Sequence, residues 1–534
     1  MRIQTLKCFS SASISLNSTK YPLKSHQKKG VKWMLEKELE TSVKGGLLCD
    51  DPGLGKTIQT IGLMLGNKVN CTLIAVPTSV INQWYNVMCE IFTKEKVYLH
   101  YGTERINNSM KLLYKIHESP IVITSHSSLF NILDKENQHT CLHDVHWGRV
   151  VIDEGHTIRN QKTLLHRMAC DLNAKHKWIL TGTPVQNKEK DIKSLFKFIG
   201  ISAREVKTNL EKCISTYLLR RTKDILFDET FKNYTVVNHS CEFTTQREQE
   251  IYSKIQEGSI QKFLKKEEEM VSNPYIQLLE LLLRLRQASI HPSIALASLK
   301  KKFPDEKWDD ESFSFNKGST KMLSALNKIK ETKGLSIVFC QFVDEMEYMK
   351  ELLLENNIYS ETYKGGMTIT ERQTILDKFK KENLIKKFVI SKKTGKPIKV
   401  NNKKPTVLLI QIKAGGVGLN LQQFSNILIL SPDWNPSNEI QGIARAHRIG
   451  QKDEVKVHKF TLIANPKYEV KDSLDKSKQL MTIDQRILNI QVQKRDIMSS
   501  ILNDDSLIFN EKFTGKELNN KLSYNDLRRM IIGS

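Results

Sequence analysis

Short apolar runs alternate with amphipathic helical patterns over the first 200 residues of the chain. Each run ends at a polar or glycine-containing loop, and the runs are Gly45–Asp50, Thr72–Val76, Ile121–Thr124, Arg149–Ile152 and Trp178–Leu180. This alternation predicts a parallel α/β domain over residues 21–200. Open sheets of this kind place ligand groups in the loops that follow their strands. Those loops are therefore the first place to look for a site.

A second α/β lobe is predicted over residues 319–500. Strands are expected at Leu335–Phe342, Val407–Ile412 and Asn426–Leu430. The pattern in Asp344–Asn357 predicts a helix whose helically spaced residues Met346, Met349 and Leu353 are buried. The fold class is thus α/β, with two parallel-sheet lobes and helical insertions between and on them.

The segment between the lobes, residues 201–318, is predicted to be a helical insertion and linker. Long helical periodicity marks Gln246–Gln261 and Tyr275–Ala288, and the charged stretch Lys300–Asp310 follows. Residues 381–404 within the second lobe are rich in lysine with glycine and proline, which predicts an exposed, mobile loop. Residues 501–534 remain as a C-terminal tail.

Residues 1–20 are serine-rich and carry no acidic side chain, a weak likeness to a transit peptide. A plain N-terminal extension is the favoured interpretation. No apolar run reaches the length of a membrane span, and no secretory signal is evident. These observations predict a soluble intracellular protein.

Composition narrows the class of partner. The 534 residues are 39% hydrophobic, enough for packed domains and against a disordered or fibrous protein. The 82 Lys and Arg against 59 Asp and Glu give a formal net charge of +23. Such a charge favours a polyanion, nucleic acid first and an anionic membrane surface second, with a functionless basic surface as the alternative. Nine scattered cysteines contain no CxxC pair, so we expect reduced thiols and no structural zinc.

The strongest local motif follows the first strand and opens a helix. It reads Asp50-Asp51-Pro52-Gly53-Leu54-Gly55-Lys56-Thr57. Glycines let backbone N–H groups approach phosphate oxygens, Lys56 reaches the β and γ phosphates, and Thr57 can ligate Mg²⁺. The segment is predicted to be a phosphate-binding loop, although Asp50 stands where the general pattern has its first glycine. Alone, the segment is also compatible with an accidental glycine-rich turn.

Two further loops carry chemistry suited to a phosphate site. Asp153 and Glu154 follow the strand Arg149–Ile152; Asp153 is placed to hold Mg²⁺ through water, and Glu154 to orient the attacking water. The loop with Thr181, Gly182 and Thr183 follows the next strand and is a candidate sensor of the γ-phosphate. Taken singly, each is also an ordinary polar turn.

In the second lobe, Asn435-Pro436 is predicted to cap and start a helix. Gln441, Arg445 and Arg448 recur on it at i, i+4 and i+7, so one face would present an amide and two guanidinium groups. Planar, permanently charged arginine suits a transferring phosphoryl group. A solvated basic stripe is the alternative.

Taken together and in order, these motifs resemble the Swi/Snf family of superfamily-two helicase-like ATPases over residues 20–495. The resemblance also rests on Tyr21–Met34, DEGHTIRN at 153–160, LTGTPVQN at 180–187, YLLRRTKD at 217–224, LRLRQASIHP at 283–292, KAGGVGLNL at 413–421 and DWNPSNEIQGIARAHRIGQ at 433–451. The spellings are nearest the post-replication-repair and transcription-termination branch, but the cysteines of its RING module are missing. Ala444 stands where many members have Asp, and Pro52 is unusual in the loop.

The resemblance implies RecA-like lobes, ATP and Mg²⁺ as cofactors, and roles for individual residues. Gln27 would read adenine, Asp50 would be normal at its position, and Arg445 and Arg448 would be arginine fingers. Gln441 would join the nucleotide site together with Gly53, Gly55, Lys56 and Thr57. Double-stranded DNA would contact loops that contain Pro77, Thr78, Thr124, Ser125, Gln341, Gly415, Gly416, Asn420 and Trp434.

The implied function is an ATP-dependent double-stranded DNA translocase that remodels or displaces DNA-bound complexes in transcription, repair or chromatin. Nucleosomes, RNA polymerase and repair complexes are the candidate targets. A strand-separating helicase and an ATP-gated DNA clamp or scaffold with little turnover are the alternatives. The expected location is the nucleus, or the cytoplasmic or virion compartment of a large DNA virus, with which the Lys-, Asn- and Ile-rich composition is also compatible.

Overall fold

The computed structural model describes residues 2–40, 42–130, 138–185, 189–223, 234–268, 274–302, 318–332, 334–380, 388–390, 397–399, 406–412, 419, 421–448, 450–451, 453–469 and 479–502. These residues form two compact units, the first largely within residues 2–223 and the second largely within residues 234–495.

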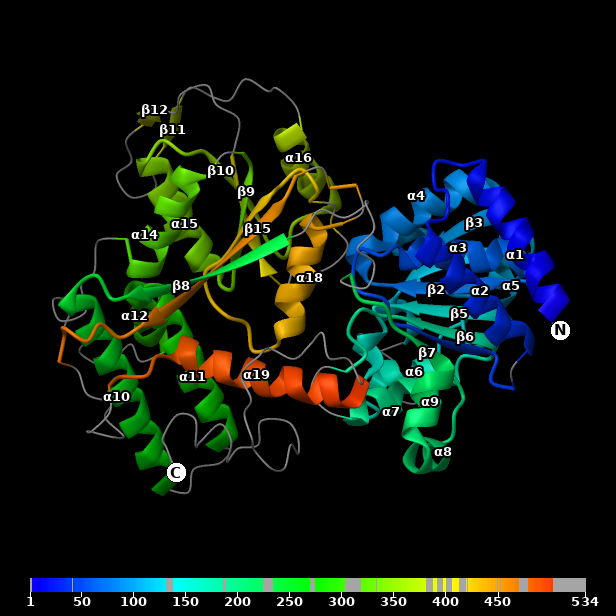
Figure 1. The fold of residues 1–534 in the computed structure, drawn as a ribbon, viewed down its shortest axis with the longest axis horizontal. Coiled ribbons are helices and arrows are strands. Elements are labelled where there is room, and N and C mark those ends of the chain that lie inside the picture. Colours follow the sequence, from blue (N-terminus) through cyan, green and yellow to red (C-terminus); the bar gives the residue numbers. More distant parts are fainter. Residues whose placement is uncertain are drawn as a thin grey trace. The chain divides into compact units, whose positions relative to one another are not determined.

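The first unit is built on a seven-stranded sheet whose neighbouring strands all pair in parallel (Figure 1). The strand order is β3 (Val97–His100), β4 (Ile121–Ser125), β2 (Thr72–Val76), β5 (Trp147–Asp153), β6 (Ala174–Leu180), β1 (Gly45–Leu48) and β7 (Leu218–Leu219). In this register Asp153 pairs with Leu180, and Leu180 pairs with Leu48. The loops after β5, β6 and β1 therefore start side by side at one edge of the sheet.

Nine α-helices surround this sheet in the described part of the first unit. They are α1 (Arg2–Asn17), α2 (Ser25–Glu40), α3 (Lys56–Gly66), α4 (Ile81–Phe92), α5 (Ser109–Glu118), α6 (Leu164–Asp171), α7 (Glu189–Phe198), α8 (Ala203–Thr208) and α9 (Leu210–Tyr217). Local sequence sets several of their starts, because the side chains of Asn108, Thr163 and Ser202 accept backbone N–H groups of the first turns of α5, α6 and α8.

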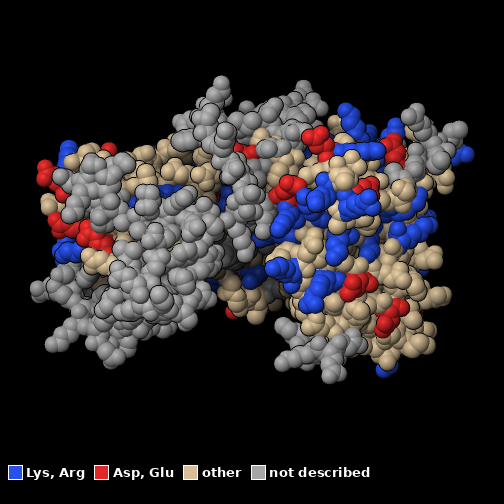
Figure 2. All heavy atoms as spheres, turned by 90° about the horizontal axis from the view of Figure 1, so that it is seen from below, with Lys and Arg blue, Asp and Glu red and all other residues tan. Residues whose placement is uncertain are grey.

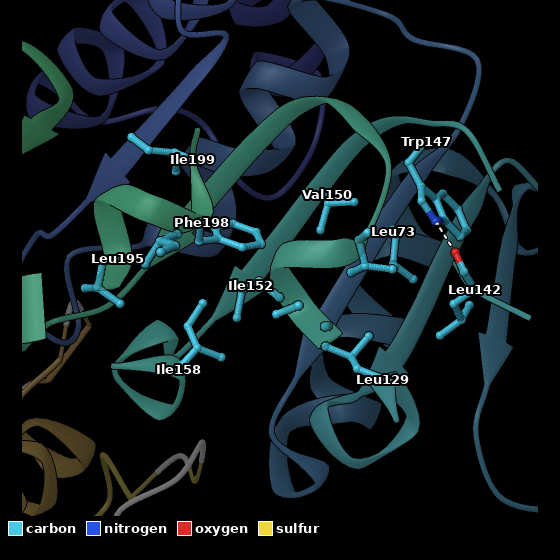
Figure 3. Close-up of a cluster of buried hydrophobic side chains, with 14 of the residues drawn as sticks. Leu73, Leu129, Leu142, Trp147, Val150, Ile152, Ile158, Leu195, Phe198 and Ile199 are labelled. Carbon is cyan, nitrogen blue, oxygen red and sulfur yellow. Dashed lines mark hydrogen bonds between the residues drawn. The ribbon is translucent and has the colours of Figure 1, made fainter. Parts of the chain in front are cut away.

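Both faces of the first sheet are buried. Successive residues of β5 alternate between two apolar clusters: Val150 and Ile152 belong to one, and Val151 to the other. Figure 3 shows part of the first cluster, in which the Trp147 indole N–H donates to the Leu142 carbonyl over 2.9 Å. A parallel sheet covered on both faces has continuous apolar strands, which explains the runs seen in the sequence.

Residues 2–17, within the segment predicted to be a plain extension, form the helix α1. Ala12 and Leu16 are fully buried, and Leu16 joins the apolar cluster that also contains Ile61 of α3. The two helices approach closely, because a Cβ on Gly66 would lie 3.0 Å from the Cys8 carbonyl oxygen. This helix is therefore an integral part of the first unit.

The second unit contains a six-stranded sheet, again with parallel pairing throughout. Its order is β10 (Ser360–Tyr363), β13 (Val407–Gln411), β9 (Ser336–Cys340), β14 (Asn426–Ile429), β15 (Val455–Ile463) and β8 (Tyr234–Glu242). Its described helices are α10 (Gln246–Glu268), α11 (Pro274–Ile290), α12 (Pro292–Lys302), α14 (Thr320–Glu331), α15 (Val343–Glu355), α16 (Ile369–Lys380), α18 (Pro436–Ala446) and α19 (Ile483–Leu502), of which the part up to Arg495 clusters with this unit.

These two sheets confirm the predicted fold class of two parallel α/β lobes. The burial of Met346, Met349 and Leu353 on α15 is also as predicted. Two strands lie in the segment predicted to be a helical insertion. The short strand β7 pairs with β1, and β8 pairs with β15 over nine residues. The Tyr-Thr-Val-Val start of β8 has the aromatic and β-branched residues that favour strands.

The segment 381–404 also differs from the loop that was predicted. Within it, β11 (Phe388–Ile390) and β12 (Pro397–Lys399) pair as a two-stranded antiparallel sheet. The apolar, β-branched end of β11 explains the pairing. The remainder of this segment, most of Lys300–Asp310 and the tail from 503 onward lie outside the described residues. Nowhere in the described ranges does a helix combine the length and apolar character required to cross a lipid bilayer.

Candidate functional site

The predicted phosphate-binding loop connects β1 to the first turn of α3. Gly53 and Gly55 adopt positive φ angles of 96° and 82°, a region that glycine enters without steric cost. A Cβ on Gly55 would lie only 2.3 Å from Nε2 of Gln27. The backbone conformation therefore favours glycine at both positions, and the close approach of the Gln27 side chain adds a second reason at Gly55.

Lys56 begins α3 and lies across this loop. Its ammonium group donates to the backbone carbonyl of Asp50 over 2.6 Å and to that of Asp51 over 3.4 Å. The amino end of α3 adds positive potential at the same place. The loop thus combines a lysine, a helix amino terminus and glycine-permitted backbone geometry, which suits a phosphate group.

Gln27, predicted to read adenine, lies beside the loop on α2. Its amide nitrogen donates to the Leu54 carbonyl over 3.1 Å, and its amide oxygen accepts from the Lys24 backbone N–H over 3.0 Å. His26 Nε2 also lies 3.0 Å from the Leu54 oxygen, and burial lowers the pKa of His26. The structure therefore places Gln27 at the loop, while its role toward adenine stays a prediction.

The acidic pair ends β5 at the adjacent position on the sheet. One carboxylate oxygen of Asp153 accepts from the Trp84 indole N–H over 2.8 Å, and the other from the Glu154 backbone N–H over 2.9 Å. Burial and the neighbouring Glu154 charge raise the pKa of Asp153 to about 6. Two crowded carboxylates of this kind gain from a bound cation.

Glu154 has an unusual backbone conformation. Its φ of 49° and ψ of 49° lie in the left-handed region, which costs a residue with a side chain about 1–3 kcal/mol. Its carboxylate lies 3.3 Å from Nδ1 of His156. His126 Nε2 lies 2.9 Å from the Asp153 carbonyl, and burial lowers the pKa of His126 to about 4. Such strain at a residue with a predicted catalytic role is typical of functional sites.

The turn that follows β6 packs directly on the phosphate-binding loop. A Cβ on Gly182 would lie 2.7 Å from two ring carbons of Pro52. The Thr181 hydroxyl accepts from the Thr183 backbone N–H over 3.2 Å and lies 3.5 Å from His156 Nδ1. The structure thus brings together the three predicted elements of the first lobe: the loop, the acidic pair and this turn.

Four side chains at this site were not singled out from the sequence. Trp84 reaches the acidic pair from α4, Gln59 donates to the Asp50 carboxylate over 2.9 Å, and the arginines Arg220 and Arg221 follow β7. The two arginines form part of the YLLRRTKD motif. This motif supports the family resemblance, but the sequence does not indicate what its arginines do. The tryptophan carries no local sequence signal, since its contact depends on β2 lying beside β5.

The predicted arginine helix of the second unit is α18. The Asn435 side chain accepts from the Ser437 backbone N–H, and Pro436 is the first helical residue, as predicted. Gln441 and Arg445 lie on this helix with only 6% and 7% of their surface exposed. The helix packs closely on β9, because a Cβ on Gly442 would lie 3.0 Å from the Phe339 ring.

Arg448 does not lie on this helix, which corrects the predicted i, i+4, i+7 face. The helix ends at Ala446, and His447 leaves the helical conformation with φ −85° and ψ 81°. Gln451 explains the early end, since its side-chain amide donates to the Ala446 carbonyl over 3.1 Å and to the Phe424 carbonyl over 3.2 Å. Arg448 therefore follows the helix in a turn and is partly exposed.

The predicted DNA contacts are found in varied settings. Thr78 is exposed after β2, and Pro77 precedes it. Thr124 and Ser125 are fully buried: the Thr124 hydroxyl donates to the His100 carbonyl over 2.9 Å, and the Ser125 hydroxyl lies 2.9 Å from that of Ser128. Their contact with DNA stays a prediction, and this placement lends it no support.

The remaining DNA candidates belong to the second unit. The Gln341 amide donates to the Asp433 carboxylate over 3.3 Å. The guanidinium of Arg286 lies 5.7 Å from the Trp434 ring centroid. Gly415, Gly416 and Asn420 lie outside the described residues.

Comparisons with known proteins identify two domains. The SNF2-related domain matches residues 26–205, and the helicase conserved C-terminal domain matches residues 318–450. Together the two ranges cover more than half of the chain. The first range contains the phosphate-binding loop and the acidic pair, and the second contains α18.

Relatives are found in eukaryotes, bacteria and a virus. An uncharacterized ATP-dependent helicase of Schizosaccharomyces pombe is 26% identical over 93% of this chain and 62% of its own length. A probable global transactivator of Orgyia pseudotsugata multicapsid polyhedrosis virus is 28% identical, covering 82% of this chain and 86% of the viral protein. Drosophila melanogaster transcription termination factor 2 is 24% identical over 96% of this chain and 59% of its own length. With these domains in this order, the chain belongs to the Swi/Snf-type family of helicase-like ATPases.

Proposed function

We propose that this protein is a DNA-stimulated ATPase that moves along double-stranded DNA and remodels or displaces complexes bound there. The observation that carries the proposal is the meeting of three loops at one sheet edge. The turn at Gly182 packs on Pro52 of the phosphate-binding loop, and its Thr181 hydroxyl lies 3.5 Å from His156 Nδ1, which in turn lies 3.3 Å from the Glu154 carboxylate. Together these loops carry the groups that ATP hydrolysis requires.

The site fits ATP with Mg²⁺. Lys56 and the backbone between Gly53 and Gly55 would hold the phosphates, because the positive φ angles of the two glycines give this backbone a conformation that suits phosphate binding. Thr57 and Asp153 would hold Mg²⁺, and the pKa of Asp153 is raised by burial and by the neighbouring Glu154 charge, which a bound cation would offset. When bound, Mg²⁺ neutralises charge on the phosphates.

Within this proposal, Glu154 orients the attacking water, because its carboxylate follows directly on the predicted Mg²⁺ ligand. Thr181 and Thr183 sense the γ-phosphate through the turn that Gly182 packs against Pro52. Arg445 and Arg448 act as arginine fingers, and Gln441 joins the nucleotide site. Burial of Arg445 at 7% exposure fits a guanidinium that is held in place rather than free in solvent.

Double-stranded DNA is the proposed partner. The formal net charge of +23 favours a polyanion. Figure 2 shows many Lys and Arg side chains, with fewer acidic ones, on the described surface of the first unit at the right of that view. The names of relatives, a transcription termination factor and a viral global transactivator, suggest a protein complex engaged in transcription as the target. The proposed location is the nucleus, or the cytoplasmic or virion compartment of a large DNA virus.

The experiment is steady-state ATP hydrolysis without DNA, with single-stranded DNA and with duplex DNA. We expect strong stimulation by duplex DNA, lost in Glu154→Gln because the attacking water is no longer oriented. Glu211→Gln, an exposed acid on α9 of the same unit, is the matched control and should behave like the unchanged protein.

Other outcomes favour the alternatives. DNA binding with turnover at background would support an ATP-gated clamp. Separation of a forked duplex would support a strand-separating helicase. An ATP hydrolysis rate that is the same with and without duplex DNA would contradict the proposal.

A further inference from the structure

Two consecutive arginines after β7 contact the phosphate-binding loop, the helices α2 and α3, and the turn at Gly182. Arg220 and Arg221 are only partly exposed, and their guanidinium groups point to the start of the phosphate-binding loop. The proposed function gives neither arginine a role. The contacts of these two arginines indicate what they do in the site.

Arg221 binds the carboxylate of Asp50 with two of its nitrogens. Nε donates to Oδ1 over 2.8 Å, and Nη2 contacts Oδ2. The same Nη2 donates to the Gln59 side-chain oxygen over 2.7 Å, and Nη1 donates to the His26 carbonyl. One guanidinium therefore joins the loop, the helix α3 and the helix α2 that carries Gln27.

The charge on Asp50 makes this pairing important. Asp50 has no exposed surface and stands at the first position of the loop, where the general phosphate-loop pattern has glycine. A buried carboxylate without a countercharge is unfavourable, and it would also repel a triphosphate. The paired guanidinium removes both effects, and its two-nitrogen geometry fixes the orientation of the carboxylate.

Arg220 contacts the next residue of the loop, Asp51. Its Nη2 lies 3.4 Å from the Asp51 carboxylate, and Nη1 donates to the Gly182 carbonyl over 3.2 Å. Backbone bonds add to this, because the Asp51 N–H donates to the Arg221 carbonyl and the Lys223 N–H donates to the Asp51 carboxylate. The loop and the turn after β6 are thus attached to one short segment.

The helix α2 packs closely against this cluster at Gly30. A Cβ on Gly30 would lie 1.8 Å from the Gln59 side-chain oxygen and 2.7 Å from Nη2 of Arg221. This close contact explains why the Tyr21–Met34 motif has glycine at position 30. Glycine there lets α2 approach the arginine that holds the loop.

We propose that Arg220 and Arg221 are positioning residues for ATP binding. Arg221 holds the phosphate-binding loop in its receptive conformation by neutralising Asp50, and Arg220 joins that loop to the turn at Gly182. Neither arginine needs to touch the nucleotide. The inference rests on the proposed binding of ATP at Lys56.

The test is a double-mutant cycle between Arg221 and Asp50 in the full chain. A fluorescent ATP analogue reports Kd, and turnover reports KM and kcat. We expect Arg221→Gln to raise Kd and KM about tenfold or more while kcat changes less, since the loss falls on binding. Arg221→Lys should rescue only partly, because an ammonium lacks the two-nitrogen geometry.

The informative variant is Asp50→Asn with Arg221→Gln. Without the buried carboxylate, loss of the guanidinium should cost at most about threefold in Kd relative to Asp50→Asn alone. Arg220→Gln should weaken binding less than Arg221→Gln, because the Asp51 carboxylate is 23% exposed while that of Asp50 is fully buried. Arg204→Gln, an exposed arginine on α8, is the matched control.

Several outcomes would overturn the inference. One is Arg221→Gln binding the analogue as well as Arg204→Gln does; another is an equal loss in the Asp50→Asn background. Circular dichroism of each variant separates these outcomes from misfolding, because Asp50→Asn would also restore the fold if the uncompensated carboxylate had unfolded Arg221→Gln. If the unchanged protein binds no nucleotide, the proposed function fails first. If it binds nucleotide without duplex stimulation, the cycle still tests the arginines.

Discussion

At the scale of single residues, the site divides into groups that face the nucleotide and groups that hold them. Lys56 and Arg448 belong to the first kind in the proposed function. Lys56→Ala should abolish turnover, because it removes the cation from the loop that would bind the phosphates. Arg448→Ala should still bind the ATP analogue but lose hydrolysis. Normal hydrolysis by the Arg448 variant would refute its assignment as an arginine finger.

A buried histidine gives a second prediction, on stability. His176 on β6 is 2% exposed, and burial lowers its pKa to about 4 despite the nearby Glu38 carboxylate. The folded-state pKa lies below the unfolded value of about 6.5. The folded protein therefore resists protonation, and stability present above pH 6.5 is lost as the pH falls toward 4.

The measurement is urea unfolding of the unchanged protein and of His176→Gln at pH 7.5 and pH 5.5. Of the free energy of unfolding lost at the lower pH, about 1 kcal/mol should come from this histidine and be absent in the variant. Arg204→Gln should keep the full pH dependence. Equal losses in all three proteins would show that His176 does not contribute.

Sequence alone predicts the nucleotide-facing residues better than their supports. Lys56, Asp153 and Gly182 follow strand-like runs in a recognisable order, so each could be named. Trp84 and Arg221 could not be assigned a role, because their contacts depend on which strands become neighbours. The positive φ of Glu154 is likewise set by tertiary packing and has no local signal.

At the scale of elements, α1 is the clearest addition to what the sequence predicts. Its serine-rich sequence shows little amphipathic pattern, yet Leu16 is fully buried against α3, the helix that follows the phosphate-binding loop. Leu16→Ala should lower the free energy of unfolding of the first unit by about 3 kcal/mol. Ile14→Ala on the same helix should change it by less than about 0.5 kcal/mol, since Ile14 is 71% exposed.

Urea unfolding monitored by tryptophan fluorescence checks this difference, because Trp178 belongs to the same apolar cluster. A similar effect of both substitutions would mean that α1 is not part of the core.

The strands show why some elements were predictable. β1, β2, β4 and β5 are buried on both faces, so their sequences are mainly apolar runs, and β6 is buried in the same way over Trp178–Leu180. β8 is different, because most of its residues are exposed and its partner β15 lies more than 200 residues later. A short stretch of sequence therefore cannot indicate that β8 and β15 pair.

At the scale of the whole molecule, the net charge of +23 sets how binding to DNA should respond to salt. Neutralised phosphates release counterions, so log K should fall linearly with log salt, with a slope of about −0.9 for each phosphate contacted. Fluorescence anisotropy of a labelled duplex over a series of KCl concentrations measures the slope. A slope near zero would argue against binding through the DNA backbone.

The pairing of β8 with β15 also determines how the chain can be divided for laboratory work. A fragment that begins at residue 318, where the helicase C-terminal match starts, lacks β8 and leaves nine residues of β15 with an open hydrogen-bonding edge. Such an edge invites pairing between copies. Light scattering should show fragment 318–502 aggregating and fragment 234–502 remaining monodisperse, so recombinant expression of the second lobe should start before Tyr234.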